Sequence, residues 1–128
     1  MNDLIAESLE MLSESEADIY GRVYEHFFRI NPDAEELMTH MDELTRGRML
    51  EEVTRLLMVN DLGTESAYVE FEYNNHKAAY NVQSRMYRQL FDAFVIAVKE
   101  SVGDAWRSEF EEAWMSRVKE LEQAFDLR

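Results

Sequence analysis

The sequence has no cysteine and few residues that break helices. Without cysteine the chain can form no disulfide, zinc–thiolate site or iron–sulfur cluster, and it has no thiol nucleophile. Only four glycines and one proline stand among 128 residues, which favours long helices. Lys and Arg total 13 against 27 Asp and Glu, so the net charge is −14. This balance argues against nucleic acid and anionic membranes as partners, because cationic surfaces bind both.

Targeting segments and most catalytic motifs are also missing. The sequence starts without the basic and apolar regions of a secretory signal, and no apolar run approaches the roughly 18 to 20 residues of a membrane-spanning helix. We therefore expect a cytoplasmic protein. There is no glycine-rich phosphate loop, His-Glu-x-x-His pair or EF-hand loop. The acidic pairs Glu35-Glu36 and Glu111-Glu112 are neighbours that point apart on a helix, so they do not indicate paired-carboxylate catalysis.

Apolar residues recur at helical spacing along the chain, and no stretch alternates long enough to predict a strand. Caps at Ser15 or Asp18 and the break at Asn31-Pro32-Asp33 help to separate the segments. The first predicted helix ends near residue 13. The others cover residues 19–28, 32–38, 42 or 45 to 59, 64 or 66 to 80, 84–101 and 106–125. We expect a single all-α domain over residues 1–128, with six or seven helices around one core.

The three histidines are the main candidates for chemistry. His26 lies beside the apolar face of the second predicted helix and His40 lies in a polar connection, so each is expected to have a structural or solvent-exposed role. His76 differs because its neighbours on one helical face include Tyr73 and Tyr80. A neutral imidazole on such an apolar and aromatic face either hydrogen-bonds within the core or binds a metal. The residues alone leave both alternatives open.

Three segments resemble the bacterial single-domain globins. The stretch HKAAYNV at residues 76–82, followed by Met86-Tyr87, is similar to their proximal segment. The stretch VYEHFFRINPD at 23–33 resembles the B helix running into the C helix, with a tyrosine at the distal tyrosine position. The stretch EAW at 112–114 resembles their H helix. The resemblance covers nearly the whole chain and implies a globin fold, a helical sandwich around a haem pocket.

The resemblance implies haem, iron protoporphyrin IX, as the cofactor, with His76 as the proximal ligand of the iron. Tyr24 would place its hydroxyl near the sixth coordination position, where a donor stabilises a bound gas. The alternative for Tyr24 is a core aromatic whose hydroxyl bonds a backbone carbonyl. Arg48 would lie at the pocket mouth near a propionate. The other positions implied to border the pocket are Met38, Thr45, Met49, Val53, Tyr80, Val82, Tyr87 and Leu90.

The sequence departs from the family pattern at four positions. Met38 stands where the family has a phenylalanine that stacks on haem, and Thr45 falls near the distal position usually held by Gln or His. Glu72 stands one turn before His76, where the family favours an apolar residue. Tyr80 follows the histidine by four residues, where many relatives have three. Methionine can fill the volume of phenylalanine, and its thioether could approach the iron.

The function implied by the resemblance is reversible binding of a diatomic gas, O2 or NO, for transport, scavenging or sensing. An enzymatic alternative is dioxygenation of NO, for which we expect a separate reductase because the chain is too short to include a flavin or nicotinamide domain. A second alternative is a haem-free globin-fold sensor or interaction module, which Met38 and Glu72 motivate. Under every alternative, Phe27-Phe28 and Leu90-Phe91 belong to the core.

Overall fold

The computed structural model describes residues 2–13, 18–39, 41–58 and 84–126, and these residues form helices and no strand. The predicted all-α class is confirmed for them. The predicted cap at Ser15, the turn at residues 60–63 and the helix up to residue 80 lie outside the described residues. The observed elements are α1 (Asn2–Ser13), α2 (Ile19–Ile30), α3 (Pro32–Leu37), α4 (Glu43–Met58), α6 (Ser84–Val102), the 3-10 turn η2 (Gly103–Ala105) and α7 (Ser108–Asp126).

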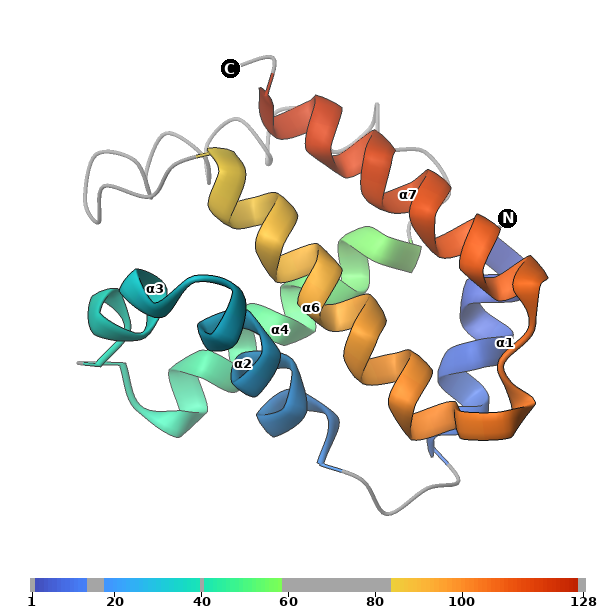
Figure 1. The fold of residues 1–128 in the computed structure, drawn as a ribbon, viewed down its shortest axis with the longest axis horizontal. Coiled ribbons are helices and arrows are strands. Elements are labelled where there is room, and N and C mark those ends of the chain that lie inside the picture. Colours follow the sequence, from blue (N-terminus) through green and yellow to red (C-terminus); the bar gives the residue numbers. More distant parts are fainter. Residues whose placement is uncertain (1, 14–17, 40, 59–83, 127–128) are drawn as a thin grey trace.

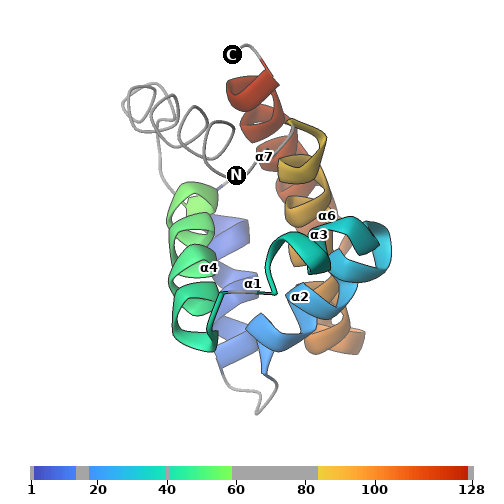
Figure 2. The ribbon, with the colours of Figure 1, turned by 90° about the vertical axis from the view of Figure 1, so that its left-hand side faces the viewer.

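The helices pack in two layers (Figure 1). Helices α2, α6 and α7 form one layer and α1 and α4 form the other, as the turned view in Figure 2 shows. Helix α6 is central, because it contacts α2, α7 and α1. Helix α7 also contacts α1 and α4, and the short α3 packs against α2. None of the helices in the described ranges combines the length and the apolar character needed to cross a membrane.

The core is built from the apolar stripes that the sequence shows. On α2, Val23, Tyr24 and Phe27 are buried and Phe28 is partly buried, which confirms the predicted inner face of this helix. Burial of each large apolar side chain stabilises the fold by roughly 1.5–3 kcal/mol. The largest fully buried side chains are Trp114, Phe91, Phe94, Phe110, Ile5, Leu50, Leu57, Leu121, Val23, Val98 and Val118.

Polar caps set where the helices begin. The Asp18 side chain accepts a hydrogen bond from the first turn of α2, and Asp42, directly before α4, does the same for that helix. Between α2 and α3, Asn31 adopts extended backbone and its side chain caps α3, while Pro32 occupies the first helical position. The sequence predicts Asp18 as one of two possible caps of α2 and Pro32 in the first turn of α3, whereas the cap by the Asn31 side chain was not predicted.

The chain reverses between α6 and α7 at Gly103, whose φ of +65° lies in the left-handed region. The sequence placed Trp106 inside the last helix, and this prediction was wrong, since α7 begins at Ser108. Trp106 has extended backbone and donates from Nε1 to Glu111 Oε2 at 2.9 Å. Its ring lies 5.6 Å from that of Phe110, so it packs on the helix without belonging to it.

The buried ring of Trp114 joins three helices. Its Nε1 on α7 donates to Ser8 Oγ on α1 at 2.9 Å, and the Ser8 hydroxyl donates to the Ile5 carbonyl at 2.7 Å. The same ring stacks on Phe94 of α6, with centroids 5.8 Å apart. Ser8 is fully buried, so it gives the indole N–H a partner where water has no access.

Replacing Ser8 tests this contact. We expect Ser8→Ala to lower the free energy of unfolding by about 1–3 kcal/mol, because the buried Trp114 N–H loses its acceptor. Ser116→Ala is the matched control, since Ser116 is an exposed serine inside α7 and shares any gain in helix propensity. Urea unfolding monitored by circular dichroism measures both. Equal effects of the two substitutions would contradict the prediction.

Two glycines form a second matched pair. At both Gly103 and Gly47 an added Cβ would meet no heavy atom within 4 Å, so only the backbone distinguishes them. We expect Gly103→Ala to destabilise the protein by about 1–2 kcal/mol, because left-handed backbone is costly for an L side chain. Gly47→Ala, inside α4, should stabilise it by about 0.5–1 kcal/mol. Thermal unfolding of both variants measures these effects. Shifts of the unfolding temperature in the same direction for both variants would contradict the prediction.

Candidate functional site

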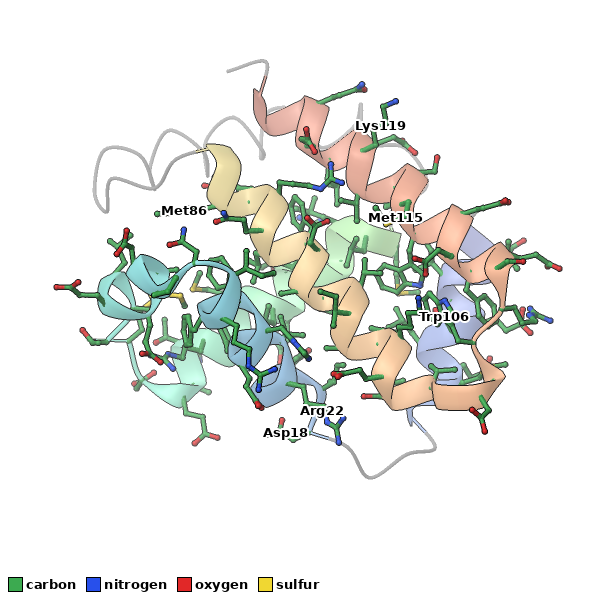
Figure 3. All side chains as sticks on the ribbon, in the orientation of Figure 1. Asp18, Arg22, Met86, Trp106, Met115 and Lys119 are labelled. Carbon is green, nitrogen blue, oxygen red and sulfur yellow. The ribbon has the colours of Figure 1, made fainter. Side chains whose placement is uncertain are left out.

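An apolar cavity of about 70 Å³ lies between α2, α3, α4 and the first turns of α6. Figure 3 labels Met86, which marks the end of α6 that borders this cavity. Almost all of the lining surface is carbon or sulfur, so the cavity suits an apolar or weakly polar ligand. The lining residues are Tyr24, Phe27, Ala34, Leu37, Met38, Met41, Met49, Met86, Tyr87 and Leu90.

The break after α2 gives the cavity one of its walls. Because Pro32 starts a new helix, α3 folds back against α2 and brings Ala34 and Met38 beside Phe27. Asn31, at the break, is buried and donates from Nδ2 to Gln89 Oε1 on α6 at 2.9 Å. This bond fixes the corner between α2 and α3 to the helix that carries the opposite wall.

Four methionines line the cavity: Met38, Met41, Met49 and Met86. Methionine is unbranched and flexible, so such walls can adjust to the shape of a ligand. Pockets that bind cofactors or drug-sized ligands usually enclose about 300–1,000 Å³. A haem at this site therefore requires these side chains to move, and methionine allows that movement at low cost.

The ring of Tyr24 forms part of the cavity wall, and its hydroxyl is hydrogen-bonded to the backbone of α4. The side chain is 7 % exposed, and its hydroxyl donates to the Arg46 carbonyl on α4 at 2.8 Å. Of the two roles that the sequence left open, the structure shows the core aromatic bonded to a backbone carbonyl. Burial raises the pKa of the Tyr24 hydroxyl above its ordinary value, and the nearby Arg46 charge opposes this effect more weakly.

Arg46 is a site residue that the sequence reasoning missed. Its Nη2 donates to the Met38 carbonyl at 2.8 Å, and its guanidinium carbon lies 5.7 Å from the ring centroid of Tyr24 and 5.4 Å from that of Phe28. The signal was present, because Arg46 precedes Met49 by three residues and therefore shares the apolar face of α4. Arg48, which the resemblance favoured, lies on another face of the helix.

The structure brings five of the expected pocket residues together around the cavity. They come from α2, the end of α3, α4 and α6, which are distant in sequence. They are Tyr24, Met38, Met49, Tyr87 and Leu90.

Three other expected residues do not line the cavity. Val53 is partly buried and packs against the core. Thr45 is exposed, and its backbone N–H donates to Asp42 Oδ1 at 2.7 Å in the first turn of α4. Arg48 is exposed on the same helix. The pKa of the Asp42 carboxyl is lowered, chiefly by the hydrogen bond from the Thr45 backbone.

The expected iron ligand His76 and its companions Tyr80 and Val82 lie outside the described residues, as do Glu72 and His40. Among the residues that are described, no group of three or more His, Asp or Glu side chains is placed to hold a metal ion. The role of iron ligand at position 76 stays a prediction from the sequence.

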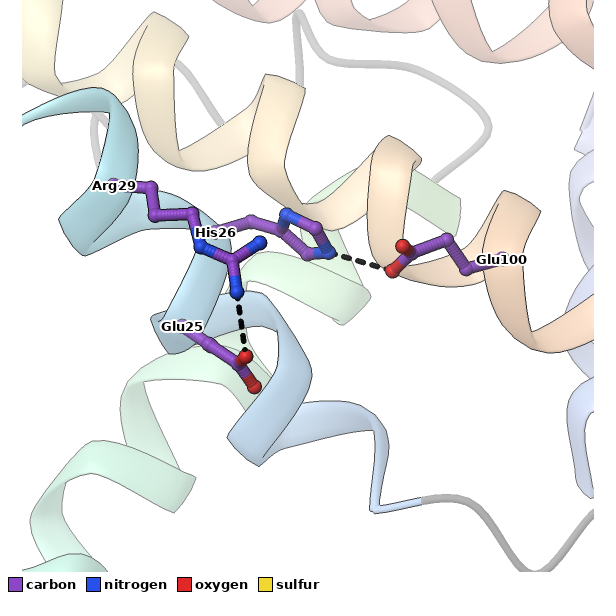
Figure 4. A network of polar contacts seen from close by, with 4 residues as sticks. All are labelled: Glu25, His26, Arg29 and Glu100. Atoms are coloured by element: carbon purple, nitrogen blue, oxygen red, sulfur yellow. Dashed lines mark hydrogen bonds and ion pairs between the residues drawn. The ribbon is translucent and has the colours of Figure 1, made fainter.

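His26 lies away from the cavity, in a polar contact between α2 and α6. Figure 4 shows its Nε2 beside Glu100 Oε1, at 2.6 Å, while Glu25 pairs with Arg29 on the outer side of α2. The His26 side chain is 15 % exposed. Of the structural and solvent-exposed roles that the sequence allowed for His26, the contact between α2 and α6 is the structural one.

Comparisons with known proteins assign no family to the chain. No family model matches it, and no curated protein matches it. The function must therefore be inferred from the residues of the chain and their arrangement.

Tyr24 makes stability depend on pH in the alkaline range. An unfolded tyrosine ionises near pH 10, whereas the folded pKa of Tyr24 is raised. Above pH 10 the unfolded state loses a proton that the folded state keeps, so the free energy of unfolding falls as pH rises, by up to about 1.4 kcal/mol per pH unit. Below pH 10 this contribution is fully present.

We expect Tyr24→Phe to make the decline above pH 10 less steep, because phenylalanine has no proton to lose. Urea unfolding of both proteins between pH 7 and about pH 11 measures the slopes. The unfolding transition at pH 7 serves as the control that the variant is folded. Identical slopes in the two proteins would show that the buried hydroxyl does not carry this dependence.

Proposed function

We propose that the protein is a globin-type haem protein that reversibly binds a diatomic gas, O2 or NO, with His76 as the iron ligand. The observation that carries this proposal is the apolar cavity around which five residues implied by the globin resemblance converge. The resemblance rests on motifs along the sequence, whereas the convergence is a property of the packed helices. The two lines of support are therefore different in kind.

The arrangement of the helices also supports the proposal. Helices α2, α6 and α7 pack over α1 and α4 in a helical sandwich, the architecture that the resemblance implies. Globins pack their helices in pairs around a haem pocket. The cavity lies at the side of this sandwich where α2 and α4 approach each other through the bond between Tyr24 and the Arg46 carbonyl.

The lining fits the chemistry of haem. Porphyrin is hydrophobic except at its propionates, so the carbon and sulfur surface of Phe27, Met38 and Leu90 suits its faces. When bound, the haem would supply the iron centre to which the gas binds. The side chains around it exclude water from this centre.

The lining also favours neutral ligands over charged ones. The Tyr24 hydroxyl has one hydrogen, which the Arg46 carbonyl accepts, so this group presents its ring to the cavity. An ion that entered would lose its hydration without gaining strong partners from the lining. A small neutral gas loses little on entering such a space. The preference for neutral over charged ligands therefore comes from the lining side chains and does not require a cofactor.

A second candidate function is a haem-free module that binds a small apolar molecule. The cavity volume of about 70 Å³ favours it, because this space accommodates a small ligand without rearrangement. Such a module would use the same walls. The two candidates differ in whether position 76 binds iron.

Reconstitution with haemin separates them. We expect the wild-type protein to gain a Soret absorption band, and His76→Ala to lose it, because the imidazole ligand is gone. His26→Ala is the matched control, since it also removes one imidazole, at a contact with Glu100 outside the cavity. Spectra after dithionite and then CO report the coordination of the iron.

Two results would contradict the haem proposal. One is a His76→Ala protein that binds haemin as well as the wild type does. The other is a colourless wild-type protein whose thermal unfolding haemin does not change, which is the result expected for the haem-free module.

A further inference from the structure

A second hollow lies directly outside the cavity. This outer cleft has a volume of about 550 Å³ and lies between α2 and the first turn of α4. Tyr24 and Met41 line both the outer cleft and the inner cavity, so these two side chains form a partition between them. The residues that line the outer cleft are Asp18, Tyr20, Gly21, Tyr24, Glu25, Phe28, Met41, Glu43, Arg46 and Gly47.

Arg46 braces this partition from the cleft side. Its guanidinium lies over the rings of Tyr24 and Phe28. The Tyr24 hydroxyl bonds the backbone carbonyl of Arg46, which every side chain at position 46 would leave in place. The Arg46 Nη2 donates to the Met38 carbonyl, which also accepts the backbone N–H of Met41 at 3.1 Å. One residue thus contacts the first half of the partition and shares an acceptor with the second.

We propose that the outer cleft is the route by which small uncharged molecules reach the inner cavity, and that the Arg46 side chain keeps this route closed by covering the Tyr24 ring and bonding the Met38 carbonyl. Arg46 acts as a positioning residue. As a path for a diatomic gas the route rests on the proposed function, whereas the closed partition can be tested without haem.

The Arg46 guanidinium can adopt a second position, turned towards the cleft, and in that position the partition is open. Its Nε is buried and meets no hydrogen-bond acceptor among the described residues, so the closed position leaves one donor unsatisfied. Glu43 lines the same cleft, and its carboxylate attracts a guanidinium that swings outward. Asp18, which caps α2, and Glu25, which pairs with Arg29, add negative charge to the cleft. These carboxylates also repel anions, which biases the route towards uncharged molecules.

The oxidation of methionines by hydrogen peroxide measures access to the inner cavity. Peroxide transfers one oxygen to a thioether and leaves as water, and the rate follows the exposure of the sulfur. Met38, Met49 and Met86 line the inner cavity and not the cleft. Peptide mass spectrometry of the haem-free protein gives the rate at each of them. Met115, labelled on α7 in Figure 3, is the exposed reference.

We expect Arg46→Ala to raise the oxidation rate of Met38 and Met49 about fivefold or more, because the guanidinium no longer covers the Tyr24 ring or bonds the Met38 carbonyl. Met11, a partly buried methionine on α1, should keep its rate. Arg22→Ala is the matched control, since it removes the same charge from an exposed position on α2 and should change no rate. Unchanged rates at Met38 and Met49 in Arg46→Ala would overturn the proposal.

Arg46→Lys decides the case in which Arg46→Ala loses its fold, which a rise at Met11 would reveal. Lysine keeps the charge but lacks the planar group that covers two rings. We expect a smaller rise at Met38 and Met49 with the thermal unfolding unchanged. If Arg46→Lys is folded and both rates stay at the wild-type value, the proposal is wrong.

A second arm uses the haem-loaded protein. After flash photolysis, CO should recombine from solution about fivefold faster in Arg46→Ala than in the wild type or Arg22→Ala, because the barrier at the partition is lower. If haem does not bind but the methionine rates change, the proposed function fails and the route stands. If haem binds but neither the methionine rates nor CO recombination changes, the route fails and the proposed function stands.

Discussion

The hydrogen bond from the Tyr24 hydroxyl to the Arg46 carbonyl ties one helical layer to the other. Helix α2 belongs to one layer and α4 to the other, so this bond of 2.8 Å fixes their separation where the cavity lies. The bond from Asn31 to Gln89 joins the corner between α2 and α3 to α6, which carries a further wall. The bond from Tyr24 to Arg46 holds the buried Tyr24 ring in the wall of the cavity, because it gives the hydroxyl an acceptor where water has little access.

Much of the fold could be predicted from the sequence because its signals are local. Asp18, Asn31 and Pro32 each act within one turn of the residue that they cap or start, and the apolar stripe on α2 needs only the helical period. The start of the last helix could not be predicted this way. Trp106 has the helical spacing of the apolar residues of α7. Its extended backbone depends on the turn at Gly103, which precedes it.

The candidate site was predicted less completely, because it depends on contacts between helices. Helical spacing shows that Met49 points inward, but it does not show that the Tyr24 hydroxyl donates its hydrogen bond to a backbone carbonyl. Arg46 shows the same limit. Its position on the apolar face of α4 was visible in the sequence, whereas its contacts with two rings and the Met38 carbonyl require the packed structure. Cavity volume depends on methionine torsions, which no sequence pattern encodes.

The contact between Trp114 and Ser8 links residues separated by 106 positions along the chain. During synthesis, α1 must wait for its indole partner until the segment that forms α7 has left the ribosome. Such non-local closure slows folding and leaves apolar surface uncovered in the meantime. Truncations that remove α7 should therefore leave the apolar surface of the remaining helices uncovered and favour their binding to chaperones. They should not yield a smaller folded unit.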